Sequence, residues 1–214
     1  KTKLNILVNG QQAQPRDGAI RLAPSYGQLN AGITLVNKGD ALVWRTLAVQ
    51  GTPSAPLPVA SSGLTLTKTV WTMSGSPADL TSLHQNDRVI VELSGRMANN
   101  YAHQMGVIDL LPAGLEIEQT LSGDDGKPYA FLGTLSDTNM ADARDDRFVG
   151  AFDIGSSYRS HDPKKPEPQP EFHIAYIARA VTTGTFVMPA GVAEDMYRPG
   201  TIGRTTLGSV TVKQ

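Results

Sequence analysis

The side chains with the most informative chemistry lie near the end of the chain, in the run Glu194–Gly200. Here Met196 and Tyr197 stand between two stretches with strand character and are followed by Arg198 and Pro199. A loop that presents a methionine and a tyrosine to water is unusual, because both side chains are more stable when buried. We therefore expect another surface to pack against this loop. The alternative is that the loop folds back and caps the core of its own domain.

The other reactive residue types form no catalytic or metal-binding motif. The chain has no cysteine, which excludes a disulfide, a thiolate metal site and a cysteine nucleophile. No Gly-x-Ser-x-Gly, Walker or Gly-x-Gly-x-x-Gly motif occurs. The histidines are scattered without helical pairing, at His84, His103, His161 and His173. We predict no catalytic residue, no metal and no cofactor, and we expect His173 to be a packed or surface histidine rather than a base.

Charge and hydropathy exclude further classes of partner. The 19 lysines and arginines nearly balance the 20 aspartates and glutamates, so the net charge is −1. No long-range field attracts nucleic acid or an anionic membrane, and we expect no nucleic acid partner. No stretch reaches the roughly 20 apolar residues of a membrane span, and the N-terminus has no apolar signal core. Any such signal is expected to have been removed or to lie upstream.

The elements that position the loop are expected to be strands. The 21 glycines and 14 prolines separate short runs rich in Val, Ile, Leu and Thr, a pattern typical of an antiparallel β-sandwich. Apolar residues occupy both faces of the longest run, Phe172–Thr182, which suits a central strand. Only Ser136–Arg144, with Asp137 as an N-cap, favours a helical turn or two. We predict an all-β fold, with further strands at Leu64–Trp71, Arg88–Leu93, Met105–Leu111, Leu115–Gln119, Phe148–Ile154, Thr185–Met188 and Leu207–Val212.

The organisation divides at a proline-rich stretch, residues 52–63, which predicts an extended connector. Residues 64–214 form a complete sandwich-sized set of strands. Residues 1–51 hold only about four short strands, expected at Leu4–Val8, Ile20–Ala23, Gly32–Asn37 and Leu42–Val49. A sheet of this size with one bare apolar face is not stable alone. We therefore expect residues 1–51 to be half of a domain.

Three polar runs receive structural interpretations. The mixed charges at residues 142–147 predict a salt-bridged turn rather than a calcium site. Gly123–Lys127 has too few spaced carboxylates for an EF-hand and predicts a hairpin turn. The proline-rich run at residues 162–170 predicts a spacer between strands, with a proline-binding partner as the alternative.

The C-terminal runs resemble a known family. Asp145–Val149, Tyr176–Pro189 and Glu194–Pro199 are similar to the end of the bacterial alpha-2-macroglobulins. Gly32–Gly39, followed by Val43-Trp44, is similar to the returning half of the CUB domain of that family, into which the thioester domain is inserted. The resemblance implies that residues 1–51 are this half-domain and that residues 64–214 are the last macroglobulin-like domain, a β-sandwich.

The resemblance also implies a function. Members of the family are broad-range protease inhibitors of the bacterial periplasm, often lipid-anchored to the inner membrane, and a cut bait segment exposes a thioester that lysines of the target protease attack. This chain lacks the cysteine, so the thioester must lie outside it. The last domain shields the thioester from water and amines. Met196 would fill an irregular gap, Tyr197 would cover it with a flat ring, Pro199 would stiffen the loop and Arg198 would bind the facing domain.

The implied partners are the thioester domain and the rest of the parent chain, target proteases, and a penicillin-binding protein. Membrane contact would occur only through the parent's lipid anchor. Such a chain is no enzyme but part of an endopeptidase inhibitor. The alternative reading is a free-standing β-sandwich that works as an adhesion or carbohydrate-binding module.

Overall fold

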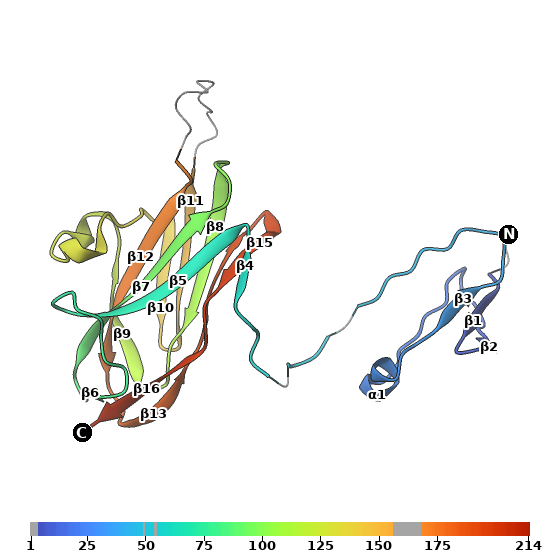
Figure 1. Cartoon of the computed structure of the whole chain (residues 1–214), viewed down its shortest axis with the longest axis horizontal. Helices are drawn as coiled ribbons and strands as arrows, with labels where there is room; N and C mark the ends of the chain where they lie inside the picture. The colour runs from blue at the N-terminus through green and yellow to red at the C-terminus, as the bar shows by residue number, and fades with distance from the viewer. Residues whose placement is uncertain (1–3, 49, 54, 156–167) are drawn as a thin grey trace, which may run out of the picture. The chain divides into compact units, whose positions relative to one another are not determined.

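The computed structural model describes residues 4–48, 50–53, 55–155 and 168–214. The chain divides into two compact units, Lys1–Thr52 and Pro53–Gln214, and we call the second the sandwich unit. Figure 1 shows that strands make up nearly all of the regular structure, which confirms the predicted all-β class. No helix within these ranges is long and apolar enough to cross a membrane. His161 and most of the proline-rich run at residues 162–170 lie outside the described residues.

The first unit is a small antiparallel sheet with one short helix. Its strands have the order β2-β1-β3 and span Gln11–Gln12, Ile6–Val8 and Leu35–Asn37. Helix α1, Tyr26–Asn30, begins with a capping box between Ser25 and Gln28. The strands expected at Ile20–Ala23 and Leu42–Val49 are not formed in the described residues. Regular pairing is therefore confined to about half of the strands expected here.

None of the described residues of the first unit is buried. Apolar side chains that would line a core instead stay exposed, namely Leu22, Tyr26, Leu42, Trp44 and Leu47. A set of strands that buries no side chain contributes little free energy of folding.

We therefore expect the sandwich unit to fold without the first unit. A chain of residues 53–214 should melt within about 2 °C of the 214-residue chain, because a loss of 1 kcal/mol shifts the midpoint of a domain this size by roughly 2–4 °C. Differential scanning calorimetry of both chains makes the comparison. A clearly lower midpoint for residues 53–214 would contradict this expectation.

Two packed sheets form the body of the sandwich unit (Figure 1). The six-stranded sheet has the order β10-β11-β8-β14-β15-β4, with bounds Met140–Arg144, Arg147–Ile154, His103–Leu110, Gly191–Asp195, Arg198–Arg204 and Ala60–Ser62. The four-stranded sheet has the order β5-β7-β12-β9, with bounds Leu64–Thr72, Arg88–Met97, Glu171–Ala180 and Leu115–Leu121. Strand β4 lies within the stretch that the sequence predicts as connector, where it pairs with β15.

A third sheet closes one end of the sandwich. It has the order β13-β16-β6, with bounds Gly184–Met188, Gly208–Lys213 and Leu83–His84. Strands β16 and β6 run parallel, whereas the strand pairs of the two larger sheets are antiparallel.

The core explains why strand β12 is apolar on both faces. Phe172, Ile174 and Tyr176 point into the main core between the two large sheets. Ala175 and Ile177 point the other way, into a second cluster. Short 3-10 helices at Gly123–Gly126 and Ala130–Leu132 belong to the segment that covers this outer face. The prediction of a central strand is confirmed, since β12 lies between β7 and β9.

Two local predictions were wrong. Ser136–Arg144 forms no helix, because Met140–Arg144 pairs with β11 as an edge strand and tertiary pairing overrides the local signal. Gly123–Lys127 is no hairpin turn, because Gly123–Gly126 forms a 3-10 helix capped by Lys127, with Gly126 buried against Leu135 of the second cluster. The charged run at 142–147 forms a salt-bridged hairpin as expected, with ion pairs Arg144–Asp142 and Arg147–Asp146.

Candidate functional site

The candidate site is the hairpin between β14 and β15. Asp195 pairs with Arg198, and the two residues between them, Met196 and Tyr197, form a tight turn that we call the tip. The pairing with β14 then skips residues 199–201 and resumes at Ile202. Pro199 begins this irregularity, because a proline has no N–H to donate to a ladder. The sequence run read as a loop is thus a sharply defined turn.

A buried carboxylate holds the turn from beneath. Asp195 Oδ1 accepts hydrogen bonds from the backbone N–H groups of Tyr197, at 2.9 Å, and Arg198, at 3.0 Å. Its other oxygen lies 2.8 Å from Nδ1 of His103, and both side chains are buried. Burial raises the pKa of Asp195, but the hydrogen bonds from His103 and from the two backbone N–H groups outweigh it and hold the pKa below its usual value. Asp195 therefore remains ionised at neutral pH.

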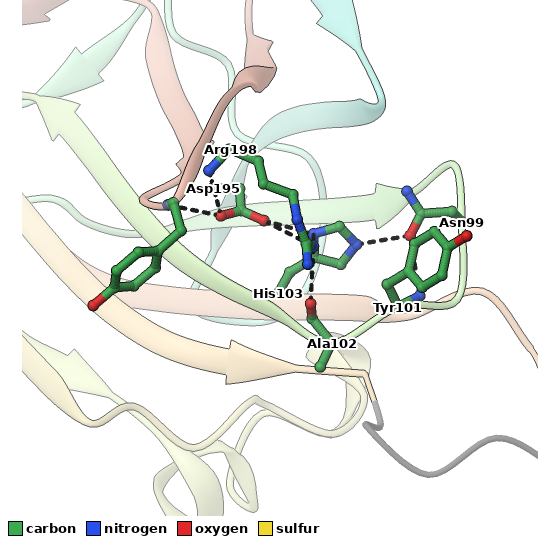
Figure 2. Close-up of polar contacts among 7 residues, drawn as sticks. Asn99, Tyr101, Ala102, His103, Asp195 and Arg198 are labelled. Atoms are coloured by element: carbon green, nitrogen blue, oxygen red, sulfur yellow. Dashed lines mark hydrogen bonds and ion pairs between the residues drawn. The ribbon is translucent and has the colours of Figure 1, made fainter.

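Figure 2 shows how this carboxylate connects to the neighbouring loop. Nε2 of His103 lies 2.9 Å from Oδ1 of Asn99. Nη1 of Arg198 donates to the carbonyl of Ala102 at 3.1 Å and lies 3.6 Å from Asp195 Oδ2. The turn is thus tied to the start of β8 by side chains from both of its strands.

The tip itself is exposed. Met196 is 52% exposed and Tyr197 76% exposed. The Met196 N–H donates to the carbonyl of Gln104 at 2.9 Å. The methionine side chain lies over Gly106, where an added Cβ would come within 3.5 Å of Met196 Cγ. A small residue here lets Met196 rest on the sheet, while the tyrosine projects from a firmly held base.

The four predicted site residues therefore lie together, and they divide into two kinds. Met196 and Tyr197 are presented to solvent, and Pro199 is exposed beside them. Arg198 makes its hydrogen bonds and ion pair within the sandwich unit, so its contacts brace the hairpin.

Sequence reasoning missed the support beneath the tip. His103 and Asp195 are 92 residues apart, and no local pattern links them. Only the pairing of β8 with β14 brings their strand ends together. One usable signal was Asp195 itself, since an aspartate just before a turn often caps the following backbone N–H groups.

The two other histidines among the described residues each lie near a carboxylate. His173 is half-buried, and its Nδ1 lies 2.8 Å from Glu92, which also accepts from the Trp71 indole. His84 lies at the surface near Asp87. Within the part of the chain that the structure describes, no three His, Asp or Glu side chains gather as metal ligands would.

Comparison with known proteins shows which family this chain resembles. The family of the bacterial alpha-2-macroglobulin MG10 domain matches residues 63–162. An alpha-2-macroglobulin of Escherichia coli is 33% identical over 174 residues, which cover 76% of this chain and 10% of that protein. This chain belongs to the bacterial alpha-2-macroglobulins. It spans about a tenth of the length of the curated relatives.

Solved alpha-2-macroglobulins share the fold over most of the chain. One is the Salmonella protein reacted with methylamine, with a TM-score of 0.60 and 26% identity over 77% of this chain and 10% of that one. Another is the Escherichia coli protein activated by porcine elastase, with a TM-score of 0.61 and 28% identity over 77% of this chain and 14% of that one.

Proposed function

We propose that this chain is part of a protease-trapping alpha-2-macroglobulin and that its tip covers the thioester of the parent protein until a protease has cut the trap. One observation carries the proposal: Met196 and Tyr197 are exposed on a turn whose base is buried and fixed by hydrogen bonds. An apolar tip that is held rigid but left uncovered is suited to pack against another domain.

The chemistry of a thioester explains why such a cover is needed. A thioester is an activated acyl group, so water or any amine would spend it before a protease arrives. A flat ring and a flexible thioether exclude water better than a polar loop would. The chain has no cysteine, so the protected group must lie elsewhere in the parent. The relatives reacted with methylamine and activated by elastase support this assignment, because an amine and a protease are the two agents that such a trap distinguishes.

The first unit fits the same proposal. Its exposed apolar residues are those that a half-domain would leave uncovered, so we assign residues 1–51 to the returning half of a CUB-like domain. We further propose target proteases and the thioester domain as partners of the parent, and a periplasmic site with a lipid anchor to the inner membrane. A penicillin-binding protein is proposed as a partner on the family resemblance alone.

The test is the rate of premature thioester loss in the full-length protein. Tyr197→Ala should raise methylamine incorporation and free-thiol release by at least about tenfold before any protease is added, because truncating an interface aromatic costs on the order of 2 kcal/mol. Tyr197→Phe is the matched control, since it keeps the flat apolar ring and should leave both rates close to those of wild type. Equal rates in wild type and Tyr197→Ala would remove the proposed function.

A further inference from the structure

We propose that His103 is a positioning residue for the tip: a doubly protonated imidazolium that joins Asn99 to Asp195 and so fixes the turn that carries Met196 and Tyr197. The arrangement is independent of what the tip covers. Its consequence for shielding rests on the function proposed above.

The first ring nitrogen faces an acceptor. Nδ1 lies 2.8 Å from Asp195 Oδ2. The other carboxylate oxygen already accepts the N–H groups of Tyr197 and Arg198. An ionised carboxylate can only accept hydrogen bonds, so Nδ1 must carry a proton.

The second ring nitrogen faces an acceptor as well. Nε2 lies 2.9 Å from Asn99 Oδ1. The orientation of this amide is fixed, because the same oxygen accepts the backbone N–H of Tyr101 at 3.0 Å, and a rotated amide would present its NH₂ group to that donor. Nε2 must therefore donate too. A histidine that donates from both nitrogens is the charged imidazolium.

Among the described residues, the contacts of the ring include one opposing charge and one like charge. Asp195, at the end of β14, is buried with the ring and compensates its charge. Arg198, at the start of β15, brings Nη1 to 3.4 Å from Nδ1, and its side chain is 56% exposed, so water screens its charge. A guanidinium can only donate, but this contact is longer than the 2.8 Å contact of Nδ1 with Asp195, which places the proton on Nδ1. Ile154 of β11, which pairs with His103, carries no charge. Asn99 and the Ala102 carbonyl contribute neutral oxygen atoms on the loop side.

This arrangement makes the hold on the tip depend on the ionisation of Asp195. On the acid side, the pKa of Asp195 is depressed in the folded protein, so its stabilisation is present above the ordinary aspartate range and is lost as the pH falls through the depressed value. The turn is therefore held best where Asp195 is ionised.

Nuclear magnetic resonance of the 214-residue chain tests the charge state directly. Long-range proton–nitrogen correlations distinguish an imidazolium from either neutral tautomer, and the signals of His103 are those missing from His103→Gln. We expect both nitrogens of His103 to carry a proton in the folded chain, because both face acceptors. A neutral tautomer in the folded chain would overturn the proposal.

Two substitutions at Asn99 separate positioning from a merely structural role. Asn99→Asp keeps an oxygen that accepts from Nε2 of His103, whereas Asn99→Leu removes that acceptor. Protection of the Tyr197 and Arg198 amides from hydrogen exchange should be retained in Asn99→Asp and reduced in Asn99→Leu. Identical exchange in both variants would overturn the proposal even if His103→Gln fails to fold.

The consequence for thioester shielding is measured in a separate experiment. In the full-length protein, methylamine incorporation in the absence of protease should be faster in Asn99→Leu than in wild type or Asn99→Asp. If the resonance and exchange results are as expected but methylamine incorporation is equally fast in wild type and both variants, His103 positions the tip but the tip does not cover the thioester. If resonance shows a neutral His103, the proposed positioning role is wrong, whatever the methylamine labelling shows.

Discussion

Asp109→Ala is expected to destabilise the sandwich unit by about 3–5 kcal/mol, which is the usual cost of removing one partner from a buried ion pair. Lys68 Nζ lies 2.8 Å from Asp109 Oδ1, and the two side chains are 6% and 0% exposed. The Tyr176 hydroxyl donates to the second oxygen at 2.7 Å. Alanine would leave a buried ammonium with only the Pro189 carbonyl, at 3.2 Å, as partner.

Urea unfolding of the 214-residue chain measures this loss. The double variant Lys68→Met with Asp109→Leu is the control, because it removes both charges and should recover most of the lost stability. A loss below about 1 kcal/mol for Asp109→Ala would show that the pair is solvated and would contradict the packing described here.

The pH dependence of stability should carry the signature of this carboxyl. Burial raises the pKa of Asp109, and the charge and hydrogen bond of Lys68 oppose the shift only in part, with a further hydrogen bond from Tyr176. The contribution of a group whose pKa is raised by folding is fully present below the ordinary aspartate value and is lost as the pH rises through the raised one. Asp109→Asn should abolish that loss when unfolding free energy is measured against pH, and an unchanged profile would contradict the assignment.

The second large effect is expected at Asp195. Asp195→Ala removes the acceptor of two turn N–H groups and the buried partner of His103, so we expect a loss of about 3–5 kcal/mol, concentrated at the hairpin. In the full-length protein, premature methylamine incorporation should rise by at least about tenfold. A loss of about 1.4 kcal/mol in the free energy that holds the tip in place is enough to change a rate by that factor.

Asp195→Asn is the matched control for this prediction. Asparagine keeps an oxygen for the Tyr197 and Arg198 N–H groups but loses the charge that faces His103, so its effects should lie between those of wild type and alanine. Hydrogen exchange at the turn reports the local loss, and thermal unfolding reports the global one. Undisturbed exchange at Tyr197 in the alanine variant would show that the carboxylate does not hold the tip.

The fold could be predicted from the sequence because its strands are strongly patterned. The alternation along Phe172–Thr182 matches strand β12, whose two faces enter two different clusters. One failure shows why local signals are not enough. Ser136–Arg144 carries a helical start signal, but pairing of Met140–Arg144 with β11 decides its structure, and such pairing is not encoded locally.

The candidate site also has one part that the sequence predicts and one part that it does not. The tip could be predicted because Met196 and Tyr197 are adjacent residues of the wrong polarity for a turn. The support beneath it could not, because His103, Asn99 and Asp195 become neighbours only through the β8–β14 pairing. The position of Arg198 depended on the same long-range geometry, which directs it to the Ala102 carbonyl of its own chain.

The central claim is that the tip of this chain lies against the thioester of its parent. The most direct measurement places a photo-crosslinking phenylalanine analogue at position 197 of the full-length protein and maps the linked peptides by mass spectrometry. We predict crosslinks to the peptide that contains the thioester in the untreated protein and their loss after reaction with methylamine or a protease. Crosslinks confined to the sandwich unit itself, or unchanged by either treatment, would contradict the account.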